Sequence, residues 1–388
     1  MNDWHTRARA LVACLAERGY LADPRWQAAF EAVPRHVFVP RFYLDDETLI
    51  DGDDPAQERK WLDAVYRDDS LVTQLTAVPG TDLMWATSSS TMPSLMAYML
   101  DLLDVQDGQR VLEIGTGTGY NAAILCHRLG DMNVASIDLH PDLVDSARGW
   151  LAQLGYWPCL AAGDGAEGMP DRAPFDRILA TCAVPALPAA WISQLRTGGL
   201  VVTDLRGGIS SSLAALRKID VDTVEGHFLP APGHFMWLRA QPGNPLRTGG
   251  DYGNVIDRDG AEQRMAALDP ASLSNPDFRF LLQRHEPGLR SIWRTVRDGV
   301  ELVCLTTDDG AWAEVETRPY AGQYTVTQGG PRRIWDRAER AADLWAELGR
   351  PARDRFGLTA TPTRHDLWLD DDGRRLWIPP AEESERSV

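Results

Sequence analysis

The feature that most constrains the fold is a short apolar run that ends in three alternate glycines and continues directly into a helical pattern. The run is Val111–Ile114, the glycines are Gly115, Gly117 and Gly119, and the helical pattern covers 121–129. Glycine is needed at such a turn because a backbone without Cβ takes positive φ and lets a ligand approach the main chain. The sequence therefore predicts a strand, a tight turn and a helix whose beginning faces a ligand.

Segments of strand and helix character alternate from residue 110 onward. Such alternation predicts a mainly parallel sheet with helices on both faces, and ligands of these sheets bind beyond the carboxyl ends of the strands. The sequence thus indicates an α/β, Rossmann-like fold. Strands are expected at 111–114, 134–137, 159–161, 177–180 and 200–205, with helices at 121–129 and 141–154.

Acidic residues stand at three places beside this expected ligand site. Asp138 ends the second strand, about 20 residues beyond the glycine turn, where an acid can bind both hydroxyls of a ribose. Glu113 is placed to accept from the amino group of a methionine moiety, and Asp164 from the amino group of adenine. The glycine spacing is Gly-x-Gly-x-Gly, whereas a dinucleotide site opens with Gly-x-Gly-x-x-Gly. Together these features favour S-adenosylmethionine (SAM) over NAD as the cofactor.

The residues after the fourth strand bear on the methyl acceptor. An enzyme that methylates an exocyclic base nitrogen is expected to carry Asn or Asp and an aromatic residue there, to orient the amine. The segment 181–185 reads Thr-Cys-Ala-Val-Pro and has neither. We therefore expect an oxygen acceptor.

Composition narrows the partners and the compartment. The chain has 388 residues, enough for two domains, and a net charge of -17, which disfavours nucleic acid because phosphate binding relies on Lys and Arg. It has no apolar stretch of membrane-spanning length and no apolar block at its beginning, so we expect a cytoplasmic protein without a membrane partner. Its five scattered cysteines form no metal-ligand pattern, and we expect neither disulfides nor a metal site.

Turn-forming residues gather around 230–233 and 241–245, so we place a domain boundary near residue 240. The expected domains are a methyltransferase domain over 1–240, in which residues 1–105 are largely helical and face the substrate, and an α+β module over 241–380, a candidate for peptide recognition. A disordered tail is expected at 381–388. We also expect helices at 4–18, from residue 24, and at 332–348, a solvated acidic loop at 45–59, a strand at 71–75, and hairpins formed by 291–297, 300–306 and 312–316 and around 372–373.

Four hydroxyl residues precede a proline and an apolar run, in the order Ser88-Ser89-Ser90-Thr91-Met92-Pro93. Hydroxyls before a proline and a helical pattern are typical of a helix start, so these residues can serve as caps alone. The alternative is that they line the acceptor site.

Several segments together resemble the protein-L-isoaspartate O-methyltransferase family. They are 32–40 (Ala-Val-Pro-Arg-His-Val-Phe-Val-Pro), 65–68 (Val-Tyr-Arg-Asp), 89–93, 111–122, 163–165 and 195–199, in the family's order over roughly residues 25–205. The resemblance implies a class I SAM methyltransferase fold and a hydroxyl segment that faces a substrate carboxylate.

Site residues follow from this resemblance and from position in the chain. One of them, Arg35, is expected at the substrate, and its alternative role is purely structural: a salt bridge that fixes the N-terminal helix. We expect Glu113, Gly115, Thr116, Gly117, Gly119, Tyr120, Asp138, Leu139, Asp164 and Gly165 to bind SAM and its product S-adenosylhomocysteine, Ser89, Ser90 and Thr91 to be the catalytic hydroxyls, and Val33, Pro34, Arg35 and Thr181 to contact the substrate.

Two departures from the family's pattern bear on the substrate. Repair enzymes of the family carry Thr-Ile-Ser-Gln-Pro or a close variant at 89–93, so the family's Ser falls on Thr91 and its Thr on Ser89. The second departure is the C-terminal module of about 150 residues, which ordinary repair enzymes lack. With such an extension the chain is similar to methyltransferases found beside ATP-grasp ligases in graspetide biosynthesis, which have lanthipeptide-associated relatives.

Three functions stay open at this point. The similarity to graspetide enzymes implies methylation of an Asp in a ribosomally made, macrocyclised precursor peptide supplied by an ATP-grasp ligase, with later closure to an aspartimide. The alternative is general isoaspartate repair in proteins. The third is a non-catalytic binding module that has kept the fold.

Overall fold

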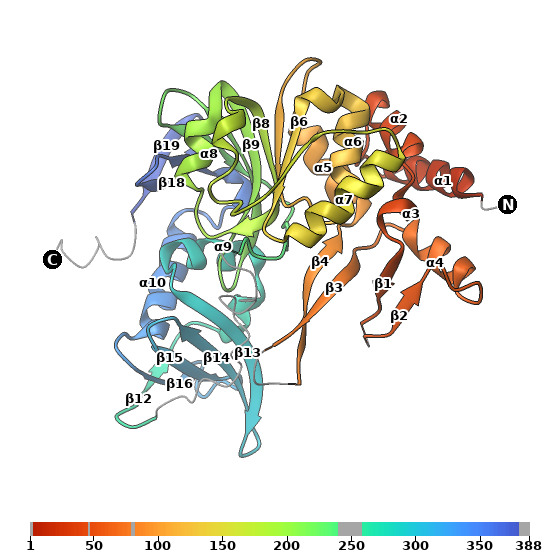
Figure 1. Ribbon diagram of the computed structural model, residues 1–388. Helices are drawn as coiled ribbons and strands as arrows, with labels where there is room; N and C mark the ends of the chain where they lie inside the picture. The colour runs from red at the N-terminus through yellow and green to blue at the C-terminus, as the bar shows by residue number, and fades with distance from the viewer. Residues whose placement is uncertain (1–2, 46, 79–81, 240–257, 380–388) are drawn as a thin grey trace.

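The computed structural model describes residues 3–45, 47–78, 82–239 and 258–379 (Figure 1). Its centre is a ten-stranded sheet with the order β19-β18-β17-β11-β10-β9-β8-β5-β6-β7. Strands β7, β6, β5, β8 and β9 run parallel to one another, and the remaining pairs are antiparallel. The predicted α/β, Rossmann-like fold is confirmed. The strands are β5 (Val111–Ile114), β6 (Val134–Asp138), β7 (Cys159–Ala162), β8 (Phe175–Val184), β9 (Leu195–Arg206), β10 (Ser211–Lys218), β11 (Val224–Phe228), β17 (Phe356–Ala360), β18 (His365–Asp371) and β19 (Arg374–Ile378).

Helices cover both faces of this sheet because successive residues of a strand point to opposite sides. In β5, Val111 belongs to a buried cluster with α5 and α6, whereas Leu112 and Ile114 belong to a second cluster with α8 and α9. All four β5 residues are buried, as is typical of a parallel strand covered on both faces. The predicted helices at 121–129 and 141–154 are confirmed. The helices are α5 (Pro93–Leu102), α6 (Tyr120–Leu129), α7 (Pro141–Gln153), α8 (Ala189–Gln194) and α9 (Pro276–His285).

The N-terminal part packs helices and a four-stranded antiparallel sheet, β2-β1-β3-β4, beside α5 and α6. The predicted helices at 4–18 and from residue 24 are confirmed, and Asp23 caps the second by accepting from the Arg25 amide at 2.8 Å. The expected solvated loop at 45–59 is wrong in part, because it contains β2, whose Ile50 is buried. The elements are α1 (Trp4–Glu17), α2 (Pro24–Ala32), α3 (Arg35–Phe38), α4 (Glu58–Val65), β1 (Arg41–Tyr43), β2 (Leu49–Asp51), β3 (Leu71–Ala77) and β4 (Met84–Ser90).

The hydroxyl residues 88–90 belong to strand β4 and not to a helix cap. Helix α5 begins at Pro93, and its N-cap residue, Met92, makes no side-chain capping hydrogen bond. The helix start is held instead by Asp68, which accepts from the Ser94 amide at 2.8 Å. The capping interpretation is therefore wrong.

The C-terminal part forms a second sheet and also extends the first. The second sheet has the order β12-β16-β15-β14-β13, and the predicted hairpins appear as the β13–β14, β14–β15 and β18–β19 pairs. Strand β17 pairs with β11, so the segment expected as a separate module shares the central sheet. The expected boundary near residue 240 and the tail at 381–388 lie outside the described residues. The further elements are β12 (Glu262–Ala266), β13 (Leu289–Arg297), β14 (Val300–Thr307), β15 (Trp312–Glu316), β16 (Tyr324–Gly329) and α10 (Ile334–Glu347), which confirms the helix predicted at 332–348.

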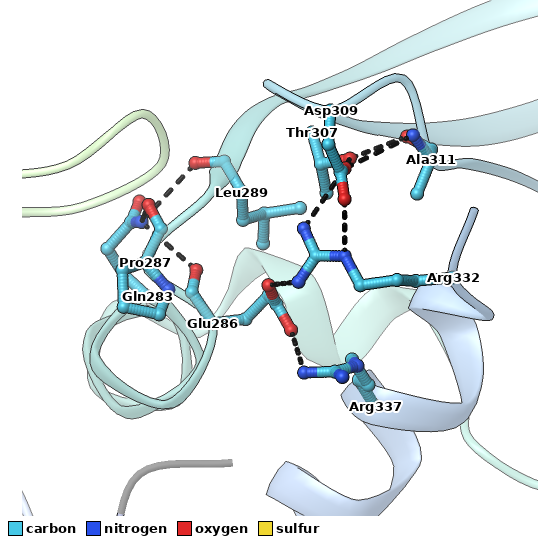
Figure 2. Close-up of polar contacts among 9 residues, drawn as sticks. All are labelled: Gln283, Glu286, Pro287, Leu289, Thr307, Asp309, Ala311, Arg332 and Arg337. Carbon is cyan, nitrogen blue, oxygen red and sulfur yellow. Dashed lines mark hydrogen bonds and ion pairs between the residues drawn. The ribbon is translucent and has the colours of Figure 1, made fainter. Parts of the chain in front are cut away.

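A buried ion-pair network holds the C-terminal part together (Figure 2). Glu286, just after α9, is 2% exposed, and its carboxylate accepts from Arg332 and, at 2.8 Å, from Arg337. Arg332 also donates to Asp309 at 2.7 Å. Because removing one partner would leave a buried charge unpaired, this network fixes β14, α9 and α10 relative to one another.

Gln283 extends this network to the central sheet. The Gln283 side chain lies on α9 and accepts from the amide of Ile209 at 2.8 Å, in the turn between β9 and β10. That turn lies against the C-terminal part of the chain. A Cβ at Gly207 would lie 2.1 Å from Gln283 Cδ, and one at Gly208 would lie 2.1 Å from the Arg290 carbonyl oxygen. The C-terminal part is therefore docked on the strands that lead to the site.

Candidate active site

A pocket of about 310 Å³ lies at the carboxyl ends of β5, β6 and β8, where ligands of parallel sheets bind. Its walls are the glycine turn, the hydroxyl residues 88–91 and a third segment, 233–239. These walls come from distant parts of the chain.

The glycine turn is fitted closely to β8. Gly115 has φ +99°, and a Cβ there would lie 2.7 Å from the hydroxyl oxygen of Thr181. That hydroxyl donates to the Gly115 carbonyl at 2.8 Å and so fixes the turn. Any side chain at this position would be both strained and in collision. Gly115, Thr116, Gly117, Tyr120 and Thr181 line the pocket as expected, whereas Gly119 is outside the lining and faces Ala147 of α7.

Asp138, at the end of β6, lines the pocket together with Leu139. One Asp138 carboxylate oxygen accepts from the Gly117 amide at 2.8 Å, and the other from the His140 amide at 3.3 Å. An ionised carboxylate has about four acceptor sites, so two bonds leave capacity for ligand hydroxyls. This geometry suits the predicted contact with a ribose.

Glu113 is fully buried at the base of the pocket. It accepts from the Ser136 hydroxyl at 2.6 Å and from the Asn121 amide group at 2.7 Å. Burial raises the pKa of the Glu113 carboxyl to about 7, although both hydrogen bonds lower it. Asn121 also lines the pocket, and its buried Oδ1 has no hydrogen-bond partner among the described residues. A ligand amino group would satisfy this acceptor, so the residues present fit the methionine part of SAM.

Asp164 is placed differently from the prediction. It is not among the described residues that line the pocket, and its carboxylate accepts from the Ala166 amide at 2.8 Å. Its neighbour Gly165 does line the pocket, and a Cβ there would lie 2.8 Å from Leu238 Cδ1. The pocket therefore meets the backbone at Gly165, and contact between Asp164 and adenine stays a prediction.

Ser89, Ser90 and Thr91 all line the pocket. The Ser90 hydroxyl accepts from Arg35 Nε at 3.3 Å. Within 3–45, 47–78, 82–239 and 258–379, no residue hydrogen-bonds to the hydroxyls of Ser89 or Thr91. The O–H groups of Ser89, Ser90 and Thr91 can all donate to an acceptor, because Ser90 uses only its oxygen in the hydrogen bond from Arg35.

Arg35 lies behind the hydroxyl residues and outside the pocket wall. Its completely buried guanidinium donates to five carbonyl oxygens at 2.9 to 3.2 Å, and the salt bridge expected for it does not occur in the described part of the chain. Burial lowers the pKa of Arg35 to about 10, so it stays charged at neutral pH. Val33 and Pro34 are also buried and line no part of the pocket, so substrate contact by these three residues stays a prediction that the geometry does not favour. The carbonyls belong to Val65, Arg67, Asp69, Ser90 and Thr91.

Sequence reasoning missed the third wall, 233–239. The segment runs beside β8, where the Ala183 amide donates to the Met236 carbonyl and the Leu238 amide to the Ala183 carbonyl, both at 2.8 Å. Its neighbouring prolines and glycines indicated a linker, and no local pattern marks a contact with a strand about fifty residues earlier. Arg239 and Asn121 were not predicted either.

The pocket offers acids, hydroxyls and a glycine turn, a set suited to binding a nucleoside with an amino-acid moiety. Burial raises the pKa of the nearby Cys182 thiol, so this thiol stays protonated and does not act as a nucleophile. In the described ranges there is no cluster of three or more His, Cys, Asp or Glu that could hold a metal ion. Among the described helices, none has the length and apolar character needed to cross a membrane.

Comparisons with known proteins give the family context. Residues 6–229 match the family model described as protein-L-isoaspartate(D-aspartate) O-methyltransferase (PCMT). A protein-L-isoaspartate O-methyltransferase of Salinibacter ruber is 35% identical over 222 residues, which are 55% of this chain and 82% of that protein. One of Methanopyrus kandleri is 34% identical over 200 residues, 50% of this chain and 76% of that protein.

Likeness in fold reaches further along the chain. A solved structure named protein-L-isoaspartate O-methyltransferase has a TM-score of 0.54 and 22% identity, and the match covers 96% of this chain and 100% of that chain. At this identity the likeness concerns the fold alone. It includes residues beyond 229, where the family match ends.

Proposed function

The chain belongs to the protein-L-isoaspartate(D-aspartate) O-methyltransferase family, and we propose that it methylates an Asp side-chain carboxylate in a ribosomally made, macrocyclised precursor peptide. Membership makes it a SAM-dependent protein carboxyl methyltransferase. What we propose is the identity of the methyl acceptor, which would be a precursor peptide and not a damaged protein.

Methyl transfer to this acceptor depends on how its carboxylate is positioned and not on removal of a proton. An Asp carboxylate is already ionised at neutral pH, so no general base is required. SAM supplies the methyl group, whose bond to sulfur breaks as the acceptor oxygen forms the new bond. Ser89 and Thr91, whose hydroxyls have no hydrogen-bond partner among the described residues, would donate to the other carboxylate oxygen. Arg35 would keep this strand end in place through the Ser90 and Thr91 carbonyls.

Esterification prepares the peptide for a second step. The methyl ester is neutral and carries a methoxy leaving group, so the following backbone nitrogen can attack the side-chain carbonyl. Methanol leaves and an aspartimide forms, which hydrolyses to Asp or isoaspartate. In a peptide pathway the aspartimide or its hydrolysis product would be the end product.

The observation that supports a peptide substrate is the placement of residues beyond the family match. The match ends at 229, yet 233–239 forms a wall of the pocket, and the strands and helices that follow pack on the same sheet. Residues that lie beyond the family match and reach the acceptor pocket are suited to selecting a particular peptide.

General isoaspartate repair is the second candidate. It is favoured by the solved structure named protein-L-isoaspartate O-methyltransferase, whose match covers 96% of this chain. A chain of this fold that extends beyond the family match is therefore compatible with isoaspartate repair. The names of the curated relatives point the same way.

A substrate comparison tests the choice. The full chain is incubated with SAM and either a cyclised Asp-bearing precursor made by an ATP-grasp ligase or a set of unrelated isoaspartyl peptides. The proposal expects a methyl ester, or a product short of one water, on the cyclised precursor alone. Methylation of all isoaspartyl peptides, with the precursor unchanged, would assign repair instead.

A further inference from the structure

The segment 233–239 is a fixed wall of the pocket and not a loose linker. Besides its two hydrogen bonds with Ala183, the amide of Phe235 donates to the buried carboxylate of Asp204 at 3.2 Å. The Arg206 guanidinium donates to the Phe235 carbonyl at 2.6 Å and lies over the Trp237 ring, 5.4 Å from its centroid. Gly233 permits this approach, because a Cβ there would lie 2.6 Å from Asp204 Cγ.

Arg239 ends this wall inside the pocket. One of its nitrogens, Nη2, donates to the Thr87 carbonyl of β4 at 2.9 Å, next to the hydroxyl residues. A guanidinium carries five donors, and the bond to Thr87 is the one that Arg239 makes among the described residues, which leaves the other donors for a ligand. Among the described residues that line the pocket, Arg239 is the one arginine or lysine.

The charge balance of the pocket favours a carboxylate as the ligand of Arg239. Glu113 and Asp138 are the acids in the described wall; burial lowers the pKa of Arg239, and the negative charge of Asp138 opposes this shift. Besides the sulfonium that bound SAM would supply, Arg239 is the cationic side chain of the described pocket lining that can offset repulsion between Asp138 and an acceptor carboxylate. Its guanidinium can hydrogen-bond the carboxylate oxygen that does not react.

We propose that Arg239 binds the carboxylate of the acceptor peptide and that this contact selects acidic over neutral side chains. The inference rests on the proposed function only in taking an Asp or isoaspartyl peptide as the acceptor. Because the family match ends at 229, Arg239 lies outside the matched residues. The carboxylate of the cofactor's methionine part has the same chemistry, and the test separates the two sources.

Binding measurements on the full chain test this without turnover. The protein is saturated with S-adenosylhomocysteine and titrated with three hexapeptides that differ in one residue, isoaspartyl, Asp or Asn. The wild type should bind one of the acidic peptides about tenfold or more tightly than the Asn peptide, the range for a hydrogen bond to a charged group. Arg239→Gln should remove this preference, and Arg239→Lys should keep part of it.

Arg59→Gln is the matched control, since this arginine side chain is 92% exposed and is not among the described residues that line the pocket. It should leave the preference unchanged. Equal binding of acidic and Asn peptides by the wild type, or an unchanged preference in Arg239→Gln, would overturn the assignment. The assignment would also be overturned if Arg239→Gln lost affinity for S-adenosylhomocysteine but kept its affinity for the acidic peptides. A wild type that prefers acidic peptides but transfers no methyl group would contradict the proposed function and leave the Arg239 contact standing.

Discussion

The side-chain carboxylate of Asp138 accepts a hydrogen bond of 2.8 Å from the backbone amide of Gly117. This bond joins the end of β6 to the turn after β5, and both residues line the same pocket. The acid expected to hold the ribose is thus oriented by the turn that approaches the cofactor.

Asp138→Asn tests this relationship. The variant loses the charge, and its amide group must present donors either to the Gly117 N–H or to the ligand hydroxyls. We expect the Kd for S-adenosylhomocysteine to rise by about tenfold to a hundredfold, the cost of one or two hydrogen bonds to a charged group. Calorimetry measures it. Asp142→Asn, on the exposed first turn of α7, is the control and should bind normally, and equal Kd values for both variants would contradict the assignment.

Glu113 should make stability depend on pH. Its pKa of about 7 lies above the ordinary value of 4.5, so the folded protein binds an extra proton between these pH values. The free energy of unfolding contributed by this group is therefore largest below about pH 4.5 and falls as pH rises to about 7.

Glu113→Gln removes this dependence. Relative to the variant, the wild type should lose up to about 3 kcal/mol over this range, since one pKa unit corresponds to about 1.4 kcal/mol. Denaturant unfolding at several pH values measures the difference. Glu17→Gln, at the exposed end of α1, should run parallel to the wild type. A constant difference between wild type and Glu113→Gln would show that Glu113 does not titrate in this way.

Arg35→Met should destabilise the protein by about 3 to 5 kcal/mol, because it leaves five buried carbonyls without their donor. Chemical denaturation measures this loss. Arg25→Met removes a half-exposed arginine side chain and should cost less than about 1 kcal/mol. If both variants were equally stable, Arg35 would not be the residue that holds the hydroxyl segment.

Phe280→Ala tests whether the C-terminal part and the central sheet are one cooperative unit. Phe280 lies on α9, is fully buried, and meets Phe228 of β11 and Phe356 of β17 at ring distances of 4.7 and 5.4 Å. The substitution should lower the free energy of unfolding by about 3 to 5 kcal/mol. Calorimetry should show a single transition at lower temperature, and two separate transitions would contradict a shared core. Deleting the chain from residue 240 would expose this core and is therefore a poor test of function.

Local patterns predicted much of the site. The strand, the glycine turn and the helix follow one another in sequence, and Asp138 stands at the end of a strand, so their proximity follows from the topology of parallel sheets. The hydroxyl residues were predicted as part of the acceptor site. Their position at the end of strand β4 was not predicted, because the proline that follows them is typical of a helix start.

Long-range contacts could not be predicted in the same way. Arg239 is held at the pocket because 233–239 pairs with Ala183 and contacts Asp204, whereas the turn-forming residues on either side of this segment indicated a domain boundary. The pairing of β17 with β11 joins residues more than a hundred positions apart. Arg35 was expected at the substrate, yet its partners are carbonyls from two separate segments, 65–69 and 90–91, which no spacing reveals.

The most direct test of the central claim is the chemistry of the transferred methyl group. The full chain is incubated with methyl-labelled SAM and the cyclised Asp-bearing precursor or an isoaspartyl peptide, and the product is treated with mild alkali. Transfer to a carboxylate oxygen predicts label that alkali releases as methanol, with the ester on the Asp or isoaspartyl residue by mass spectrometry. Label that resists alkali, or no transfer to either peptide by protein that binds SAM, would contradict the account.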